Sequence, residues 1–311
     1  MAVFTATRAF DSTELQPFLG EIKTATAKRI DIAETGGSAY ISYAGSFTYS
    51  GGYLSKGSVT KLTYMKDGLQ YFTVTGKFDA LLLSNALDNA YYQDDITVLQ
   101  EFLYSGNDTF NGSSGNDYLD VYGGGTDKIL AGAGNDIVSA STDAKSSIDG
   151  GSGNDFISTY GNSDTISGGL GNDIFSLSAA NPQKALIKDF QFGADRVQFY
   201  ISPASSIIPK LFDGSEFGDS WLEFYAKQIA VGKGVKSALD SDDILAYDTS
   251  TGTLYLDEDG VGGSAGIALV QFYNKPTLTA QQLADNVLYV KVVGSQTLTG
   301  LFSDFLSNEF S

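Results

Sequence analysis

Residues 38–76 show the clearest alternation of polar and hydrophobic positions. Polar residues alternate there with Tyr, Phe, Val, Ile and Thr in the runs SAYISYAGSFTYS, SVTKLTYM and LQYFTVTG. This period of two predicts β-strands. The runs are interrupted at residues 50–52 (SGG) and 66–68 (KDG), and the Asp-Gly pair of the second break is a strong hairpin signal. The segment is therefore expected to form strands that are joined by a hairpin.

The hydrophobic period lengthens after residue 77. Apolar residues recur at helical spacing between 78 and 104, as at Phe78, Leu82 and Ala86. They predict one or two helices, broken near residues 93–95, whose aromatic residues pack in the core. A shorter helix is expected over 12–20, with Ser12 as its N-cap.

A third pattern fills residues 103–176, where Gly, Asn, Asp and Ser dominate. Eight units follow one another without a gap, each nine or ten residues long. Each unit has an Asp, or Ser146 in one case, and an apolar residue two positions later. The apolar positions are Phe110, Leu119, Ile129, Val138, Ile148, Ile157, Ile166 and Phe175. A flexible linker would not hold this phase, so the stretch is an internal repeat.

Four of these units resemble the nonapeptide G-G-x-G-x-D-x-U-x of the RTX, or hemolysin-type calcium-binding, family. They read GSSGND, AGAGND, GGSGND and GGLGND. The resemblance implies a parallel β-roll, in which each unit forms a six-residue turn and a short strand and two units complete one coil. The lone apolar residue of each unit would point inward.

The resemblance also implies that the turns bind calcium. Ca²⁺ prefers six to eight oxygen ligands, which turn carbonyls and one carboxylate per loop would supply between stacked loops. The candidate ligands are Gly112, Ser114, Asn116 and Asp117; Ala131, Ala133, Asn135 and Asp136; Gly150, Ser152, Asn154 and Asp155; Gly168, Leu170, Asn172 and Asp173; and Asp108, Asp127 and Asp164. Aligned aspartates repel without calcium, so binding and folding are expected to be one event.

The two sides of such a roll would differ. Alternate units stack on the same side, so the four regular loops form one ladder that ends at Asp117, Asp136, Asp155 and Asp173. The opposite side has Ser146 in place of a carboxylate, with Lys145 beside it. About three well-formed calcium sites are expected between the regular loops, and fewer or weaker sites opposite.

The sequence beyond the repeat predicts a β-rich cap. ALIKDFQFGADRVQF (185–199) and DDILAYDTSTGTLYLDEDGVGG (242–263) resemble the C-terminal domain of serralysin-like secreted proteins, and IALVQF (267–272) predicts a further strand. A solenoid needs such caps at both ends.

Two features of this cap leave alternatives open. The cluster Asp257, Glu258 and Asp259 could be a further calcium loop or a solvated turn. Trp221, with Phe217, Phe224 and Tyr225, is expected in the core rather than in a sugar-binding site.

Composition and charge narrow the possible chemistry. Lys and Arg total 19 against 37 Asp and Glu, a net charge of −18, which disfavours nucleic-acid binding and favours metal cations. Histidine and cysteine are absent. Their absence excludes Cys nucleophiles, Ser-His-Asp triads, disulfides, histidine-based zinc sites and iron–sulfur clusters. No apolar run reaches the ~18 residues of a transmembrane helix.

The expected fold is mainly β, with a central parallel β-roll over 105–177. A β-rich and helical N-terminal cap is expected over 1–104 and a β-rich C-terminal cap over 178–293. Residues 294–311 are a candidate secretion signal, because LFSDFLSNEFS (301–311) is similar in character to the uncleaved signals that type I secretion systems read. The N-terminus shows no cleavable secretory signal. Export by a type I system is therefore expected.

Three functions compete. The first is a non-enzymatic structural component of the cell exterior, a surface layer, fibre or matrix, that self-assembles. The second is an adhesin or glycan-binding protein, similar to the RTX modules attached to alginate epimerases. The third, an enzyme with carboxylate chemistry, is the weakest, because no catalytic-sized domain remains once the roll and caps are assigned. We expect the first, with Ca²⁺ as the ligand.

Overall fold

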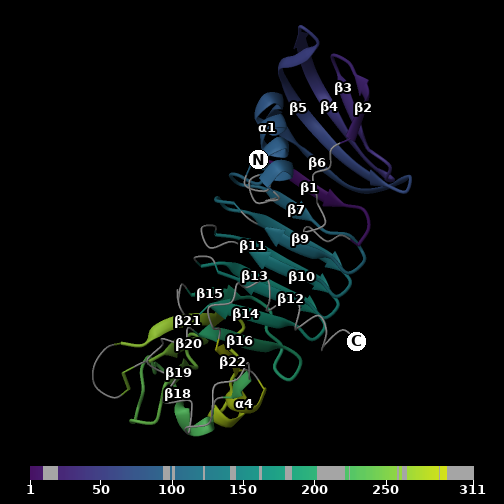
Figure 1. Ribbon diagram of the computed structural model, residues 1–311. Coiled ribbons are helices and arrows are strands. Elements are labelled where there is room, and N and C mark those ends of the chain that lie inside the picture. Colours follow the sequence, from purple (N-terminus) through teal and green to yellow (C-terminus); the bar gives the residue numbers. More distant parts are fainter. Residues whose placement is uncertain are drawn as a thin grey trace.

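The computed structural model is a mainly β protein built around a two-sided coil (Figure 1). It describes all residues except 10–19, 94–98, 100–101, 122, 141–144, 161–162, 179–183, 202–220, 224, 258, 261–264, 287 and 293–311. Among the described residues, no helix combines the length and the apolar character needed to cross a bilayer.

Two stacks of parallel strands form the centre. The first stack, in sheet A, contains β7 (Thr109–Asn111), β9 (Lys128–Ala133), β11 (Ser147–Ser152), β13 (Thr165–Leu170) and β15 (Ala185–Ile187). The second, in sheet B, contains β8 (Tyr118–Val121), β10 (Ile137–Ala140), β12 (Phe156–Thr159), β14 (Ile174–Ser178) and β16 (Arg196–Ile201). Alternate repeat units therefore lie in the same sheet, which confirms the parallel β-roll.

The apolar position of each unit fills the core of the roll. Ile129 pairs in register with Phe110 on one side and Ile148 on the other, and Val138 pairs with Leu119 and Ile157. All eight side chains are almost fully buried. Several units add a second core residue two positions later, namely Val121, Ala131, Ala140 and Leu177.

An antiparallel meander continues sheet A at the N-terminal side. Its strands are β2 (Gly20–Ala25), β3 (Arg29–Glu34), β4 (Ala39–Ser50), β5 (Tyr53–Lys66) and β6 (Leu69–Asp79). β4, β5 and β6 confirm the three strands expected over 38–76. β1 (Val3–Ala6) joins this meander to the roll, because Phe4 pairs with Val74 of β6 and with Phe110 of β7.

Helix α1 (Ala80–Gln93) follows β6 and covers the inner face of the meander. Asp79 caps it, since its Oδ1 accepts the backbone N–H groups of Leu81 and Leu82 at 2.9 and 3.0 Å. Leu99, Phe102 and Leu103 are also helical. The break expected at residues 93–95 and the helix expected over 12–20 fall largely or wholly outside the described residues.

The C-terminal part extends both sheets. It contains β17 (Trp221–Glu223), the short helix η2 (Ala226–Gln228), β18 (Ile229–Gly232), β19 (Leu245–Asp248), β20 (Thr253–Leu256), β21 (Ile267–Phe272), α4 (Ala280–Asn286) and β22 (Leu288–Val292). β21 pairs with β15 and β22 with β16, so strands follow the last coil in both sheets. Sheet A thus runs through fifteen strands, from the meander to this cap.

Candidate metal centre

The turns of neighbouring coils are hydrogen-bonded to one another, as the strands are. The Gly134 N–H donates to the carbonyl of Ser152 at 2.9 Å, and the Gly153 N–H donates to that of Leu170 at 2.8 Å. Gly153 has a φ of +126°, and a Cβ there would lie only 1.9 Å from the carbonyl oxygen of Gly134. Glycine is required at this position both by its dihedral angle and by the approach of the next coil.

A ladder of aspartates ties the regular turns together. Asp117 N–H donates to Asp136 Oδ1 at 2.8 Å, Asp136 N–H to Asp155 Oδ1 at 2.9 Å, and Asp155 N–H to Asp173 Oδ1 at 3.0 Å. These carboxylates are 3% exposed or less. Asp136, Asp155 and Asp173 therefore each reach back to the preceding coil with one oxygen.

The second oxygen of three of these carboxylates has no partner. Oδ2 of Asp136, of Asp155 and of Asp173 is buried and accepts no hydrogen bond. A buried carboxylate oxygen without a partner is costly, whereas a bound cation would satisfy it. Asp117 differs, because its Oδ2 accepts the Ser113 N–H at 2.6 Å.

At the turn of Asp155 a main-chain carbonyl lies close to the open carboxylate oxygen. A Cβ placed on Gly150 would lie 2.4 Å from Asp155 Oδ2 and 2.7 Å from the carbonyl oxygen of Gly168 in the next coil. A Cβ on Gly168 would lie 2.2 Å from Asp173 Oδ2. The first residue of the turn therefore leaves room where a carboxylate and a carbonyl meet. Among the described residues no three carboxylates gather, so most ligands of a cation would be carbonyls, which suit Ca²⁺.

The asparagine side chains brace the same turns. Asn116 Oδ1 accepts the Asn135 N–H at 2.8 Å, Asn135 Oδ1 accepts the Asn154 N–H at 2.8 Å, and Asn154 Oδ1 accepts the Asn172 N–H at 2.9 Å. The fifth residue of a turn thus reaches forward to the next coil, while the sixth reaches back. The roles of the asparagines as calcium ligands stay predictions.

The remaining candidate ligands of the regular loops lie at the first and third positions. Gly150 and Gly168 border open oxygens, Gly112 borders the bonded Oδ2 of Asp117, and Ala131 has a methyl group at the equivalent place. The carbonyls of Ser152 and Leu170 each accept one hydrogen bond and keep a second lone pair. Ser114 and Ala133 lie in the same stacked turns. Their roles as ligands stay predictions.

The opposite side of the roll is less open. Asp108 N–H donates to Asp127 Oδ1 at 2.8 Å, and Ser146 N–H donates to Asp164 Oδ1 at 2.7 Å. The second oxygen of Asp164 accepts the Thr159 hydroxyl, so it is not free for a cation. Among the described residues of this side, the unpartnered carboxylate oxygen is Asp108 Oδ2. That this side binds calcium more weakly stays a prediction.

Burial controls the protonation of the ladder. It raises the pKa of Asp136 and of Asp155 to about 7, although each carboxylate accepts one backbone hydrogen bond that lowers the value. Burial likewise raises the pKa of Asp127 and Asp195 to about 6. Neighbouring aspartates add to the increase. A proton and a metal cation would therefore compete for these carboxylates near neutral pH.

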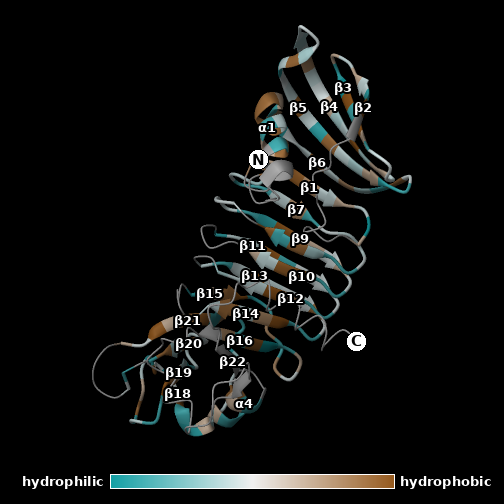
Figure 2. Cartoon of the chain, in the orientation of Figure 1, coloured by the Kyte–Doolittle hydropathy of each residue, from teal (hydrophilic) through white to brown (hydrophobic). Residues whose placement is uncertain are grey.

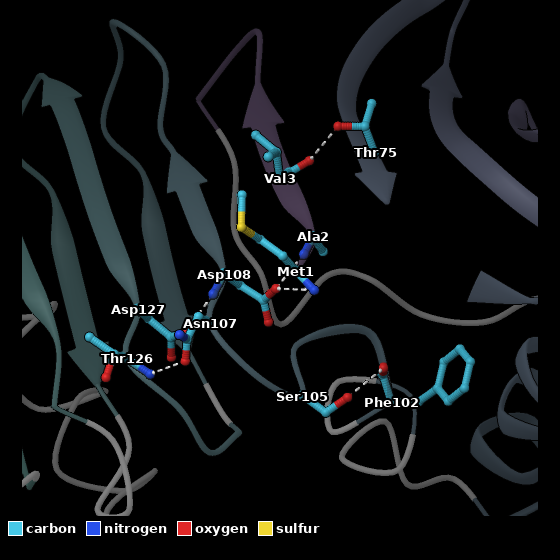
Figure 3. A network of polar contacts seen from close by, with 10 residues as sticks. All are labelled: Met1, Ala2, Val3, Thr75, Phe102, Ser105, Asn107, Asp108, Thr126 and Asp127. Atoms are coloured by element: carbon cyan, nitrogen blue, oxygen red, sulfur yellow. Dashed lines mark hydrogen bonds and ion pairs between the residues drawn. The ribbon is translucent and has the colours of Figure 1, made fainter. Parts of the chain in front are cut away.

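Strand β1 occupies the place of a coil before the first repeat. Figure 3 shows Asp108 between Asp127 and Ala2, whose N–H donates to Asp108 Oδ1. The Asp108 N–H donates to the Asp127 carboxylate in the same way. In addition, the Thr109 N–H donates to the Ala2 carbonyl at 3.0 Å. The sequence VFTA of β1 did not indicate this role.

The ladder also extends past the last repeat. Asp173 N–H donates to Asp195 Oδ1 at 3.1 Å, and Asp195 Oδ2 accepts the Gln191 N–H at 2.7 Å. Asp189 accepts the N–H groups of Gly168 and Gly169 at 3.0 and 3.1 Å. The sequence interpretation missed both aspartates as members of the ladder, because the step from 173 to 195 breaks the nine-residue phase.

Two uncertain features of the C-terminal cap can now be placed. Both oxygens of Asp257 accept backbone N–H groups, from Ala238 at 2.9 Å and Gly260 at 3.0 Å, and Asp257 is buried, so this residue belongs to a hydrogen-bonded turn that is not solvated. Glu258 lies outside the described residues. Trp221 begins β17 and Tyr225 is exposed, whereas Phe217 and Phe224 lie outside the described residues.

A family model agrees with the repeat. The family model of the RTX calcium-binding nonapeptide repeat (four copies) matches residues 104–138, 121–144 and 146–175. A similar solved structure is the AlgE6R3 subunit of the Azotobacter vinelandii mannuronan C5-epimerase, at 21% identity, with 59% of this chain and 78% of that chain covered and a TM-score of 0.21. The comparison with curated proteins gave no match.

Substitutions should separate the two sides of the roll. Asp136→Ala or Asp155→Ala removes an open buried oxygen, so we expect the calcium concentration at the folding midpoint to rise about tenfold or more. Asp164→Ala should raise it less, because Asp164 Oδ2 is already bonded to Thr159. Calcium titrations followed by circular dichroism would compare the three, and equal shifts would contradict the assignment of sides.

The calcium-free roll should become more stable as the pH falls. The folded chain holds protons on Asp136 and Asp155 up to about pH 7, whereas the unfolded chain releases them near the ordinary value of 3.8. This stabilisation is complete below about pH 4 and is lost as the pH rises through about 7. In chelator, circular dichroism should therefore show more folded roll at about pH 5 than at about pH 8. With limiting calcium the same acidification should weaken calcium binding, and no pH effect in chelator would contradict the buried ladder.

Proposed function

Since residues 104–175 are RTX calcium-binding nonapeptide repeats, we propose that the protein is a non-enzymatic structural component of the cell exterior that folds when it binds calcium. The observation that carries this proposal is the row of buried carboxylate oxygens without partners at Asp136, Asp155 and Asp173. They destabilise the calcium-free fold, and a bound Ca²⁺ would remove this cost by coordinating them.

The calcium requirement supports a location outside the cell. Cytosolic calcium is kept too low to fill sites of carbonyls and shared carboxylates, while calcium outside the cell is abundant. A chain of this kind would stay unfolded inside the cell and fold after export. The acidic and apolar residues of 301–311, which lie outside the described residues, supply a candidate signal for a type I secretion system.

The residue types favour a structural role over catalysis. The chain has no histidine or cysteine, and in the described part no three titratable metal-ligand side chains come together. The aspartates of the roll are spaced along a ladder, each bonded to the next coil, rather than paired across a cleft. Such an arrangement holds coils together and offers no surface to a substrate.

The charge of the chain would make self-assembly depend on calcium. At −18, two copies repel each other, and each bound Ca²⁺ cancels two negative charges. Calcium would thus fold each copy and reduce the repulsion between copies. The alternative function, an adhesin that works as a monomer, requires the folding but not the association.

Light scattering would distinguish these two functions. Calcium is raised stepwise at constant ionic strength, with circular dichroism recorded on the same samples. We expect folding first and then a calcium-dependent increase in particle mass, with magnesium a poor substitute because it requires tighter octahedral geometry. A protein that stays monomeric after the roll has folded would contradict assembly and favour the adhesin.

Deletion of residues 301–311 would test export. We expect the truncated chain to accumulate inside cells that have a type I secretion system, while the full chain reaches the medium. As a control, both purified chains should fold at the same calcium concentration. Equal export of both chains would show that the tail is not the signal.

A further inference from the structure

The N-terminal half of sheet A has an open outer face. Core residues Tyr43, Leu62 and Val74 point toward the interior, so the residues that alternate with them on the same strands point away from it. α1 packs on the inner face, where Leu83 joins the core. Among the described elements, none is packed over the outer face. Figure 2 shows hydrophilic positions along β4 and β5.

Cations form a row across this face. Cross-strand pairing connects Arg29 through Ala44 to Lys61, and Lys61 through Thr75 and β1 to Thr109 and Lys128. Neighbouring strands lie about 4.8 Å apart, so Arg29 and Lys128 are about 10 Å and 19 Å from Lys61 along the row. All three are exposed.

A row of hydroxyl groups runs beside the cations. Ser42 pairs with Thr63, Thr63 with Thr73, Thr73 with Thr5, and Thr5 with Asn111. Each lies two residues from a member of the first row on its own strand, so both rows share the outer face at a separation of about 7 Å. Hydroxyl and amide groups can both donate and accept hydrogen bonds.

Two acidic residues of the described chain lie on or beside this face: Asp31, which is paired with a cation, and the exposed Asp149 of β11, the strand next to Lys128. Asp31 is buried, and its Oδ1 accepts the Arg29 Nε–H at 2.6 Å. The surrounding segment 20–78 carries seven Lys and Arg against four Asp and Glu, a net charge of +3. The rest of the chain therefore has a net charge of −21, which together with this +3 gives the total of −18. At physiological salt, charges are screened beyond about 8 Å, so a ligand on this face experiences mainly the local positive charge.

We propose that this face binds an anionic polysaccharide that lies across the strands. Its carboxylate or sulfate groups pair with Lys61 and Lys128, since Arg29 is already bonded to Asp31 and Tyr40, and its hydroxyl groups exchange hydrogen bonds with the Ser and Thr row. The two rows contain no aromatic side chain, whereas proteins that bind single-stranded nucleic acids stack bases on aromatic rings. This polysaccharide would be the extracellular partner of the protein. The proposal rests on the proposed function only in assuming that the protein is outside the cell, where such a polysaccharide would be met.

Binding would be measured with the full chain folded in millimolar calcium. The probes are heparin for sulfate, hyaluronan for carboxylate and dextran as a neutral polysaccharide. The test variant combines Lys61→Gln and Lys128→Gln. The matched control combines Lys227→Gln and Lys233→Gln, two exposed lysines of the C-terminal cap, and changes the net charge by the same amount.

We expect the unmodified chain to bind heparin or hyaluronan more tightly than dextran. The Lys61/Lys128 variant should bind about tenfold more weakly, and the control should stay within about twofold. Equal losses in both variants, or no binding of either anionic probe, would overturn the proposal. Tighter binding of single-stranded DNA than of both anionic polysaccharides would overturn it too. The assay uses purified folded protein, so its failure would leave calcium folding, assembly and export untouched.

Discussion

The structure depends on carboxylates that are buried at the contact between coils. Asp136, Asp155 and Asp173 each use one oxygen to accept an N–H group from the neighbouring coil, and their other oxygen is left buried without a partner. The first oxygen fixes the stacking of the turns. The second makes this stacking unfavourable unless a proton or a cation is present. The same residue therefore holds the coils together and makes their folding depend on a bound proton or cation.

The rest of the chain covers the two ends of the roll. β1 takes the place of a preceding coil through Ala2 and Asp108, and Asp195 ends the ladder with both of its oxygens bonded. Sheet A continues on either side, into the meander and into β21. A single hydrophobic cluster runs from Phe4 to Phe272 as a result. Calcium bound in the middle should thus stabilise strands that contain no repeat.

The sequence predicted the roll because each unit carries its own signal. The phase of Ile129, Val138 and their equivalents determines both the inward position and the alternation between sheets, and the structure places these residues as expected. Asp195 was missed because a longer turn separates it from Asp173. β1 was missed because four residues do not reveal their partner. The row from Arg29 to Lys128 joins strands that are far apart in sequence, so it appears only once the register is known.

The most direct test of this account is a crystal structure of the calcium-loaded protein, with ions located by their anomalous scattering. The account predicts calcium within about 2.3–2.6 Å of the second oxygens of Asp136, Asp155 and Asp173, with turn carbonyls completing each site. It would be contradicted if those oxygens bound no ion, or bound only protein groups, while the roll kept the same stacked turns.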